Sequence, residues 1–438
     1  MYALHTFMPL TPVQFDSAPQ TSVIFAIRME GFHQCKVGRI DMKDLDDEAY
    51  NALMAKEITD LRAQINDRAV CELTSSLNSG KLCSIEHPSK FVGSVALTGR
   101  ANYHARIRFD DGSETWLLRV PRVTGFPVHL AEYLIRSEFA TLKFLETTTV
   151  PAPRAFSFGN KSQGTDRGVG VCFLLIEELA GKPWDGQGDT YKVWQGLAEI
   201  LAELEKHEFH QAGSLCVESP QDQPIISVTA SDRFVCLDPW GPFEKSADYY
   251  SAWAEQYLVL VTDGQLYPEF PVEAYLVYRF LKDKATELSL HDHGFFLKHV
   301  DDKGDHLMVD EDYNIIGIID WQMSRLVPRR EAFGLSLVSA DMNALCNGYV
   351  SLSAQDVALS KALGEKSKSL ASYTENDKIR RFFWGLGLET DWTLALPLAN
   401  AILEAFGEEK PWDIWKDEQL SHCDGDECLL ALLAYSSK

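Results

Sequence analysis

The sequence predicts an α+β protein of two lobes, in which a small antiparallel sheet with one helix precedes a larger, mainly helical lobe. Residues 91–122 alternate apolar and polar side chains in three runs separated by turn residues, which is typical of antiparallel strands. Residues 128–146 carry apolar side chains three and four positions apart, as an amphipathic helix does. From residue 181 onward this helical spacing dominates, so we expect the second lobe to begin there.

The first 80 residues are expected to form an N-terminal extension that is partly helical. Their start is irregular, and residues 46–75 then form an acidic to amphipathic run that suits a helix. The sequence assigns this extension no chemistry.

The small lobe is expected to span residues 81–180 and to contain five strands. Turn residues at positions 98–102 and 110–113 separate the first three strands. Pro151 and Pro153 then end the helix. The expected strands are residues 91–97, 103–109, 115–122, 154–158 and 171–176.

The large lobe, residues 181–438, is expected to be helical apart from one β-hairpin. Residues 306–310 and 315–320 are apolar runs joined by the polar turn 311–314. Several runs with helical spacing flank the hairpin, and no internal repeat is visible.

Composition limits the partners of the protein. The 438 residues include 41 basic and 64 acidic side chains, a formal net charge of -23. This charge argues against a nucleic acid or an anionic membrane as the main partner and favours a neutral or cationic small molecule. We find no basic and then apolar leader and no run of about 18 apolar residues, so a cytoplasmic protein is expected.

The nine cysteines are scattered and odd in number, so they do not form a disulfide framework. His422, Cys423 and Cys428 lie close together but lack a second ligand pair, so we expect no metal site there.

Two aspartates carry the chemistry that the sequence predicts. A His-x-Asp segment, His299 to Asp301, leads into the hairpin, and the hairpin ends in Asp320. A hairpin brings its two ends together, so both carboxylates can share one site. Phosphoryl transfer needs such a pair, with one carboxylate for the attacking hydroxyl and one for Mg²⁺. Each residue also has a structural alternative, because Asp often follows a buried strand as a turn residue and His299 could be a core histidine.

The order of these features resembles the aminoglycoside-phosphotransferase and choline-kinase-like family, which has a protein-kinase-like fold. That family writes its loop roughly as H-G-D-x-x-x-x-N-I-L-V-D, followed by an apolar strand and I-D-W. Here His299-Val300-Asp301, residues 307–310 and Ile319-Asp320-Trp321 match it without a gap up to the hairpin turn. The resemblance covers about residues 90–406 and is closest to the fungal branch of the family.

The resemblance implies roles for residues near the reaction. Asp301 would be the catalytic Asp, Asp320 the metal ligand and His299 a brace for the loop. Arg119 takes the place of the strand-three basic residue that pairs with the α- and β-phosphates, and Arg122 is its rival. An Arg presents a planar fork that can bind phosphate oxygens bidentately.

Further implied residues contact the nucleotide. Glu138 on the helix would pair with the basic residue. Gly99 and Asn102 would belong to the loop that covers the phosphates, where Gly allows close backbone approach. Backbone groups of Glu178 and Leu179, at the junction of the lobes, would bind adenine. The implied cofactors are ATP and Mg²⁺.

One residue departs from the family's pattern. His306 stands where the family has the Asn that is the second metal ligand, although Mg²⁺ prefers oxygen donors. Three alternatives follow: Asp305 or Asp302 supplies the oxygen, His306 hydrogen-bonds Asp301, or the site binds metal poorly.

The function that these features favour is a kinase acting on a hydroxyl of a small molecule. Trp321-Gln322 follows Asp320 in place of Phe-Gly, which disfavours a protein kinase. A nucleotide-binding pseudokinase or interaction module is the alternative that His306 motivates, and an acid-base hydrolase is disfavoured. By analogy with the family, helices near residues 382–406 would line the acceptor pocket, with the following side chains as candidates: Trp384, Glu389, Asp391 and Trp392.

Overall fold

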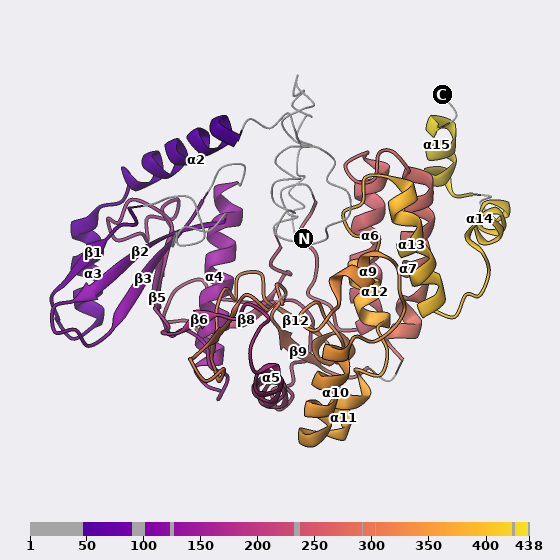
Figure 1. The fold of residues 1–438 in the computed structure, drawn as a ribbon. Helices are drawn as coiled ribbons and strands as arrows, with labels where there is room; N and C mark the ends of the chain where they lie inside the picture. Colours follow the sequence, from indigo (N-terminus) through magenta and orange to yellow (C-terminus); the bar gives the residue numbers. More distant parts are fainter. Residues whose placement is uncertain are drawn as a thin grey trace, which may run out of the picture.

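The computed structural model describes residues 47–89, 101–122, 127–231, 237–290, 292–302, 304–422 and 425–436. A small lobe with a sheet lies on the left of Figure 1, and a larger lobe dominated by helices lies below it and to the right. This confirms the predicted α+β fold with a small antiparallel sheet followed by a mainly helical part.

The small lobe is built on a five-stranded antiparallel sheet within the described residues, in the order β1-β2-β3-β5-β4. Its strands are β1 (Cys83–Glu86), β2 (Asn102–Phe109), β3 (Thr115–Pro121), β4 (Ala155–Gly159) and β5 (Phe173–Glu177). The strand expected at residues 91–97 lies outside the described residues. The described edge strand is β1, whose Cys83 pairs with Phe109 of β2. We missed β1 because four residues carry too little alternation to predict a strand.

The two faces of this sheet contact different helices. Helix α4 (Val128–Leu145) covers one face, where Leu174 and Ile176 join the main core. The alternate residues Phe173 and Leu175 point to the other face and join a second core cluster. The same period of two places Arg119 on the α4 side of β3, because neighbouring strand residues point to opposite faces.

Helices α2 (Asp47–Arg62) and α3 (Asp67–Leu77) cover that second face. The single helix expected over residues 46–75 is therefore two helices. Asn66 causes the break, because its side chain accepts a hydrogen bond from the backbone of Ala69 and begins α3 as an N-cap. The described part of the N-terminal segment is packed into the small lobe (Figure 1).

Replacing Ile58 with Ala is expected to lower the free energy of unfolding by about 2–5 kcal/mol. The Ile58 side chain is fully buried between α2 and the sheet, so its loss leaves a cavity. Urea unfolding of Ile58→Ala, beside Lys56→Ala on the exposed side of α2, measures this cost. Equal midpoints for both variants would show that α2 does not support the lobe.

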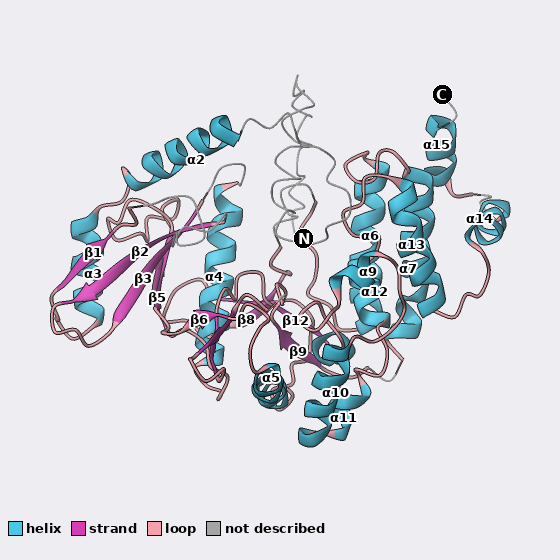
Figure 2. Ribbon diagram, viewed as in Figure 1, coloured by secondary structure: helices cyan, strands magenta, loops and turns pink. Residues whose placement is uncertain are grey.

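The large lobe contains eleven helices within the described residues, and Figure 2 shows them below and to the right of a few short strands. These helices are α5 (Thr190–Leu204), α6 (Ser246–Thr262), α7 (Pro271–Leu288), α8 (Arg329–Phe333), α9 (Met342–Cys346), α10 (Ala354–Lys366), α11 (Lys368–Ser372), α12 (Lys378–Trp384), α13 (Trp392–Ala405), α14 (Trp412–Ser421) and α15 (Glu427–Ser436). Among the described residues, no helix is long and apolar enough to cross a bilayer.

The predicted hairpin is present as β10 (Leu307–Val309) and β11 (Ile315–Ile318). Asp310 closes its turn, since its side chain accepts hydrogen bonds from the backbone of Asp312 and of Asn314. Further short strands surround it: β6 (Lys182–Pro183), β7 (Ser214–Cys216), β8 (Ile225–Ser227), β9 (Phe295–Lys298) and β12 (Arg325–Pro328). Strand β6 pairs with β10, and β9 pairs with β12. The hairpin is thus held by β6 on the β10 side, and the separate β9–β12 pair ties together the segments before and after it.

Candidate active site

Arg119 joins the two lobes through an ion-pair cluster in which Arg119 and Glu138 are buried and Asp320 is partly exposed. Its Nη1 donates to Oε1 of Glu138 at 2.6 Å, and its Nη2 donates to Oδ1 of Asp320 at 2.5 Å. Arg119 is 3% exposed and Glu138 is 2% exposed. Burial raises the pKa of Glu138 to about 7, although the charge of Arg119 opposes that rise. Strand β3, helix α4 and the end of the hairpin thus place three charged groups together.

Asp320 has an unusual backbone conformation and a stabilised negative charge. Its φ of 62° lies in the left-handed region, which Asp tolerates better than most residues. The next residue, Trp321, is buried and donates from Nε1 to the carbonyl of Ile318, which holds this turn. Burial acts to raise the pKa of Asp320, but the charge of Arg119 outweighs it and holds that pKa well below its usual range.

We call the segment that carries the predicted catalytic residue Asp301, residues 299–302 and 304–306, the catalytic loop, and two histidines brace it. Nε2 of His299 lies 2.9 Å from the carbonyl of Ile319. Burial lowers the pKa of His299, so the ring is neutral and Nε2–H donates this bond. His299 therefore ties the loop before Asp301 to the residue before Asp320, which agrees with a bracing role.

His306 lies between the two predicted carboxylates. Its Nδ1 is 2.9 Å from the backbone carbonyl of Asp301 and 3.8 Å from the Oδ2 of that residue. Its Nε2 is 3.7 Å from Oδ2 of Asp320, and Oδ1 of Asp305 lies 4.0 Å from Nδ1. With Nδ1–H donating to the Asp301 carbonyl, the ring fixes the catalytic loop, and this geometry favours the alternative in which His306 hydrogen-bonds Asp301.

Gln322 is a site residue that the sequence reasoning did not assign. Its Oε1 accepts a hydrogen bond from Nη2 of Arg119 at 3.0 Å and lies 2.9 Å from the side-chain amide of Asn102, whose oxygen, when turned toward Arg119, accepts from Nη2 at 2.6 Å. Asn102, which the sequence placed in the phosphate-covering loop, is buried at the start of β2. The position of Gln322, two residues after Asp320, was the signal available in the sequence. An isolated Gln, however, belongs to no pattern that would mark it as a site residue. Gly99 lies outside the described residues.

The carboxylates fit a metal ion that a nucleotide brings with it. No group of three or more His, Cys, Asp or Glu side chains among the described residues is arranged to hold a metal ion. Mg²⁺ in nucleotide sites commonly takes only one or two protein carboxylates and completes its shell with phosphate and water. The Asp320 side chain is 37% exposed, so one of its oxygens can serve in this way.

The residues expected to bind adenine lie where the lobes meet. The backbone N–H of Glu178 already donates to the carbonyl of Thr115 at 3.0 Å, and the Glu178 side chain pairs with Arg106 at 2.7 Å. The side chain of Leu179 packs on Gly317 of β11, where an added Cβ would lie 2.2 Å from Cδ1. The junction of the lobes therefore contacts the β10–β11 hairpin directly.

Two other predictions from the sequence are placed away from these groups. Arg122 forms an ion pair with Glu57 of α2 at 2.5 Å, so the structure favours Arg119 over its rival. Asp391 caps α13 by accepting from the backbone of Thr393, and Trp392 packs against Trp412. These contacts stabilise the helices.

Lys298 and Glu331 support the catalytic loop from β9 and α8. Nζ of Lys298 donates to the backbone carbonyl of Glu331 at 2.9 Å and lies 3.7 Å from Oδ2 of Asp302. The Glu331 side chain is 3% exposed, and its Oε2 has no hydrogen-bond partner among the described residues. Burial raises the pKa of Glu331 to about 7, against the opposing charge of Lys298.

The free energy of unfolding is expected to decrease as the pH rises from about 4.5 to 7, because of the raised pKa of Glu331. In that window the folded protein keeps a proton that the unfolded chain releases, so rising pH favours unfolding. Glu331→Gln removes this contribution, and its stability relative to the wild type should rise by about 3 kcal/mol across the window. Urea unfolding at several pH values measures the difference, with Glu375→Gln at an exposed position as control. A difference that does not change with pH would contradict a protonated Glu331.

A sequence model of the phosphotransferase enzyme family matches residues 99–346, more than half of the chain. The chain belongs to this family. The matched region contains the ion-pair cluster, the catalytic loop and the hairpin, so the predicted resemblance is confirmed. The protein is therefore a phosphotransferase, as the order of its motifs indicated. No curated protein sequence matches the chain.

Several solved structures of kinases and phosphotransferases are similar to the chain at low identity. An ethanolamine kinase of Plasmodium vivax is 10% identical, with 77% of this chain and 81% of that chain covered and a TM-score of 0.39. A choline kinase of Streptococcus pneumoniae is 13% identical, with 78% and 97% covered and a TM-score of 0.38. A macrolide 2'-phosphotransferase gives the same identity, coverage and score. The family assignment therefore rests on the sequence match.

Proposed function

We propose that this phosphotransferase transfers the γ-phosphate of ATP, bound with Mg²⁺, to a hydroxyl group of a small molecule. The observation that carries the proposal is the contact of Arg119 with both Glu138 and Asp320. Asp320 is far from Arg119 and Glu138 in sequence, and such a cluster of one cation between two carboxylates has the components of a nucleotide phosphate site.

The phosphate chain would lie at Arg119. Its guanidinium is held by Glu138 on one side, so it is fixed before the nucleotide arrives and loses little freedom on binding. Asp320 now accepts from the same guanidinium and would be the carboxylate that holds Mg²⁺. Bound Mg²⁺ would neutralise charge on the β- and γ-phosphate oxygens.

Asp301 would orient the acceptor hydroxyl and accept its proton. Its side chain is 35% exposed, and its backbone carbonyl is fixed by His306. His299 anchors the same loop through its hydrogen bond to the carbonyl of Ile319. Catalysis by these residues would consist mainly of positioning and electrostatic stabilisation, since phosphoryl transfer asks little covalent chemistry of the protein.

Calorimetric titration with ATP and Mg²⁺, followed by a turnover assay over a panel of alcohols and amino alcohols, tests this proposal. Wild-type protein should bind the nucleotide more tightly with Mg²⁺ than without, and Asp320→Asn should lose this gain. Binding without turnover would favour the alternative, a nucleotide-binding pseudokinase. Absence of both binding and turnover would reject an ATP-dependent enzyme.

A further inference from the structure

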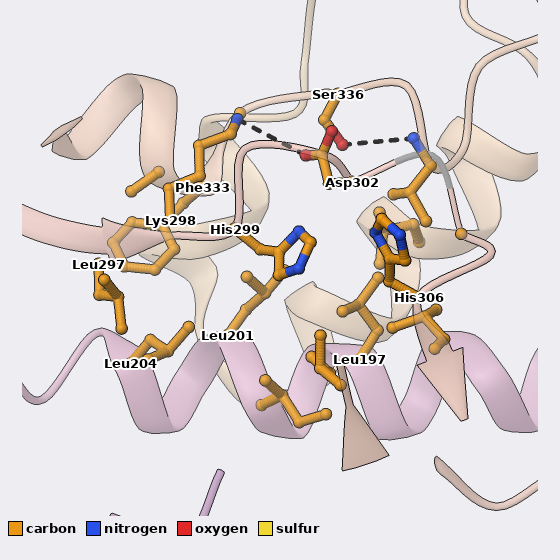
Figure 3. A pocket seen from close by; sticks show the side chains of 18 of the residues that line it. Leu197, Leu201, Leu204, Leu297, Lys298, His299, Asp302, His306, Phe333 and Ser336 are labelled. Carbon is orange, nitrogen blue, oxygen red and sulfur yellow. Dashed lines mark hydrogen bonds and ion pairs between the residues drawn. The ribbon is translucent and has the colours of Figure 1, made fainter. Parts of the chain in front are cut away.

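A cavity of about 70 Å³ lies behind the catalytic loop, between that loop and helices α5 and α10. Figure 3 shows Leu197, Leu201 and Leu204 of α5 along one side, with the rings of His299 and His306 opposite them. Helix α10 contributes further leucines, and the segment after α8 closes the remaining side. The cavity therefore joins the scaffold of the large lobe to the back of the catalytic loop.

This cavity is separate from the proposed phosphate groups. Arg119, Glu138 and Asp320 do not line it, as judged from the described residues. The catalytic loop separates the cavity from the phosphate groups. Asp301 and His306 of this loop border the cavity, and Nε2 of His306 also lies 3.7 Å from Oδ2 of Asp320. A molecule in the cavity would therefore touch the loop without occupying the phosphate site.

The lining is apolar at depth and polar at one end. The leucines of α5 and Phe333 are buried or nearly so. At the polar end, Lys298 faces Asp302 at 3.7 Å, as the dashed line in Figure 3 marks. Such a combination of an apolar wall with a few convergent polar groups is typical of small-molecule sites.

We propose that the cavity binds a small, uncharged, mostly apolar molecule and that this molecule stabilises the catalytic loop. An apolar cavity of roughly 150 Å³ can stay dry and accept benzene. The present cavity is about half that size, so a short alkyl group with one hydroxyl directed at Asp302 is the class of ligand that fits.

The contacts that hold the catalytic loop explain how such a ligand acts. His299 bonds the carbonyl of Ile319, His306 bonds the carbonyl of Asp301, and Lys298 bonds the carbonyl of Glu331. All three side chains border the cavity. A ligand packed against them favours the loop position in which these bonds are made, because it binds that state better than one with the side chains displaced.

Xenon is a suitable first probe because it is apolar and small. A crystal of the full chain under xenon pressure should show xenon between α5 and the catalytic loop. Val338 lines the cavity, so Val338→Phe places a ring in it and should remove that peak, whereas Val357→Phe on the exposed side of α10 should leave it. Leu201→Phe serves the same purpose if Val338→Phe does not fold. Xenon elsewhere only, or ordered water in its place, would overturn the proposal.

Hydrogen exchange tests the effect on the catalytic loop in solution. Amide exchange of residues 299–307 should slow at least twofold under xenon compared with nitrogen at equal pressure, and Val338→Phe should abolish the difference. Unchanged exchange in the wild type despite a bound xenon would overturn the coupling to the loop. Neither measurement needs turnover, so this inference stands or falls separately from the proposed function.

Discussion

Asp301→Asn should lower kcat by about 10²–10⁴-fold while nucleotide affinity stays close to that of the wild type. The substitution removes the proton acceptor for the hydroxyl and keeps the shape of the side chain. It also keeps the backbone carbonyl to which His306 bonds, so the catalytic loop has no reason to move. Initial rates with a saturating acceptor from the panel, beside calorimetric affinity for the nucleotide, measure both quantities.

A matched control lies in the hairpin that follows the catalytic loop. Asp312 is exposed in the turn between β10 and β11, and Asp312→Asn changes the same functional group without touching the loop. Its kcat should equal that of the wild type. Full activity in Asp301→Asn would remove that residue from the reaction.

Arg119→Met should lower the free energy of unfolding by about 3–5 kcal/mol and abolish binding of the nucleotide. The Met side chain keeps the apolar stem but leaves Glu138 buried without its partner. Arg119→Lys should lose less stability than Arg119→Met, because the ammonium group keeps the positive charge. Some loss should remain, because one ammonium group cannot present two separate nitrogens to two carboxylates. Denaturant unfolding and nucleotide titration give the two readouts.

A double variant separates the structural effect from the functional one. Arg119→Met combined with Glu138→Leu removes both members of the buried pair and should recover much of the lost stability. Nucleotide binding should stay lost, because the phosphate-facing cation is still missing. Recovery of both stability and nucleotide binding would show that Arg119 only balances the charge of Glu138.

The elements that sequence predicted well are those with long or distinctive patterns. Helix α4 was expected at residues 128–146, and it spans Val128–Leu145 because its apolar side chains recur at helical spacing over several turns. The hairpin was also expected, since two apolar runs flank a polar turn. The pairing of Arg119 with Glu138 was expected from the resemblance to the family, and the structure brings these two side chains together.

Other features depend on contacts that no local pattern reveals. Gln322 gains its place only because β2 and β3 bring Asn102 and Arg119 to the same point. Glu331 is buried because α8 packs against β9. The residues around Glu331 in the sequence do not distinguish it from an exposed Glu. The packing of α2 and α3 against the sheet is equally a tertiary property.

We propose that Arg119 and Asp320 form the site for the nucleotide and its metal beside Asp301. A crystal structure with Mg²⁺ and a non-hydrolysable ATP analogue tests it most directly. We predict Mg²⁺ on a carboxylate oxygen of Asp320, Arg119 on the phosphates and the γ-phosphate facing Asp301. A nucleotide bound elsewhere, or a metal ion with no contact to Asp320, would contradict the claim.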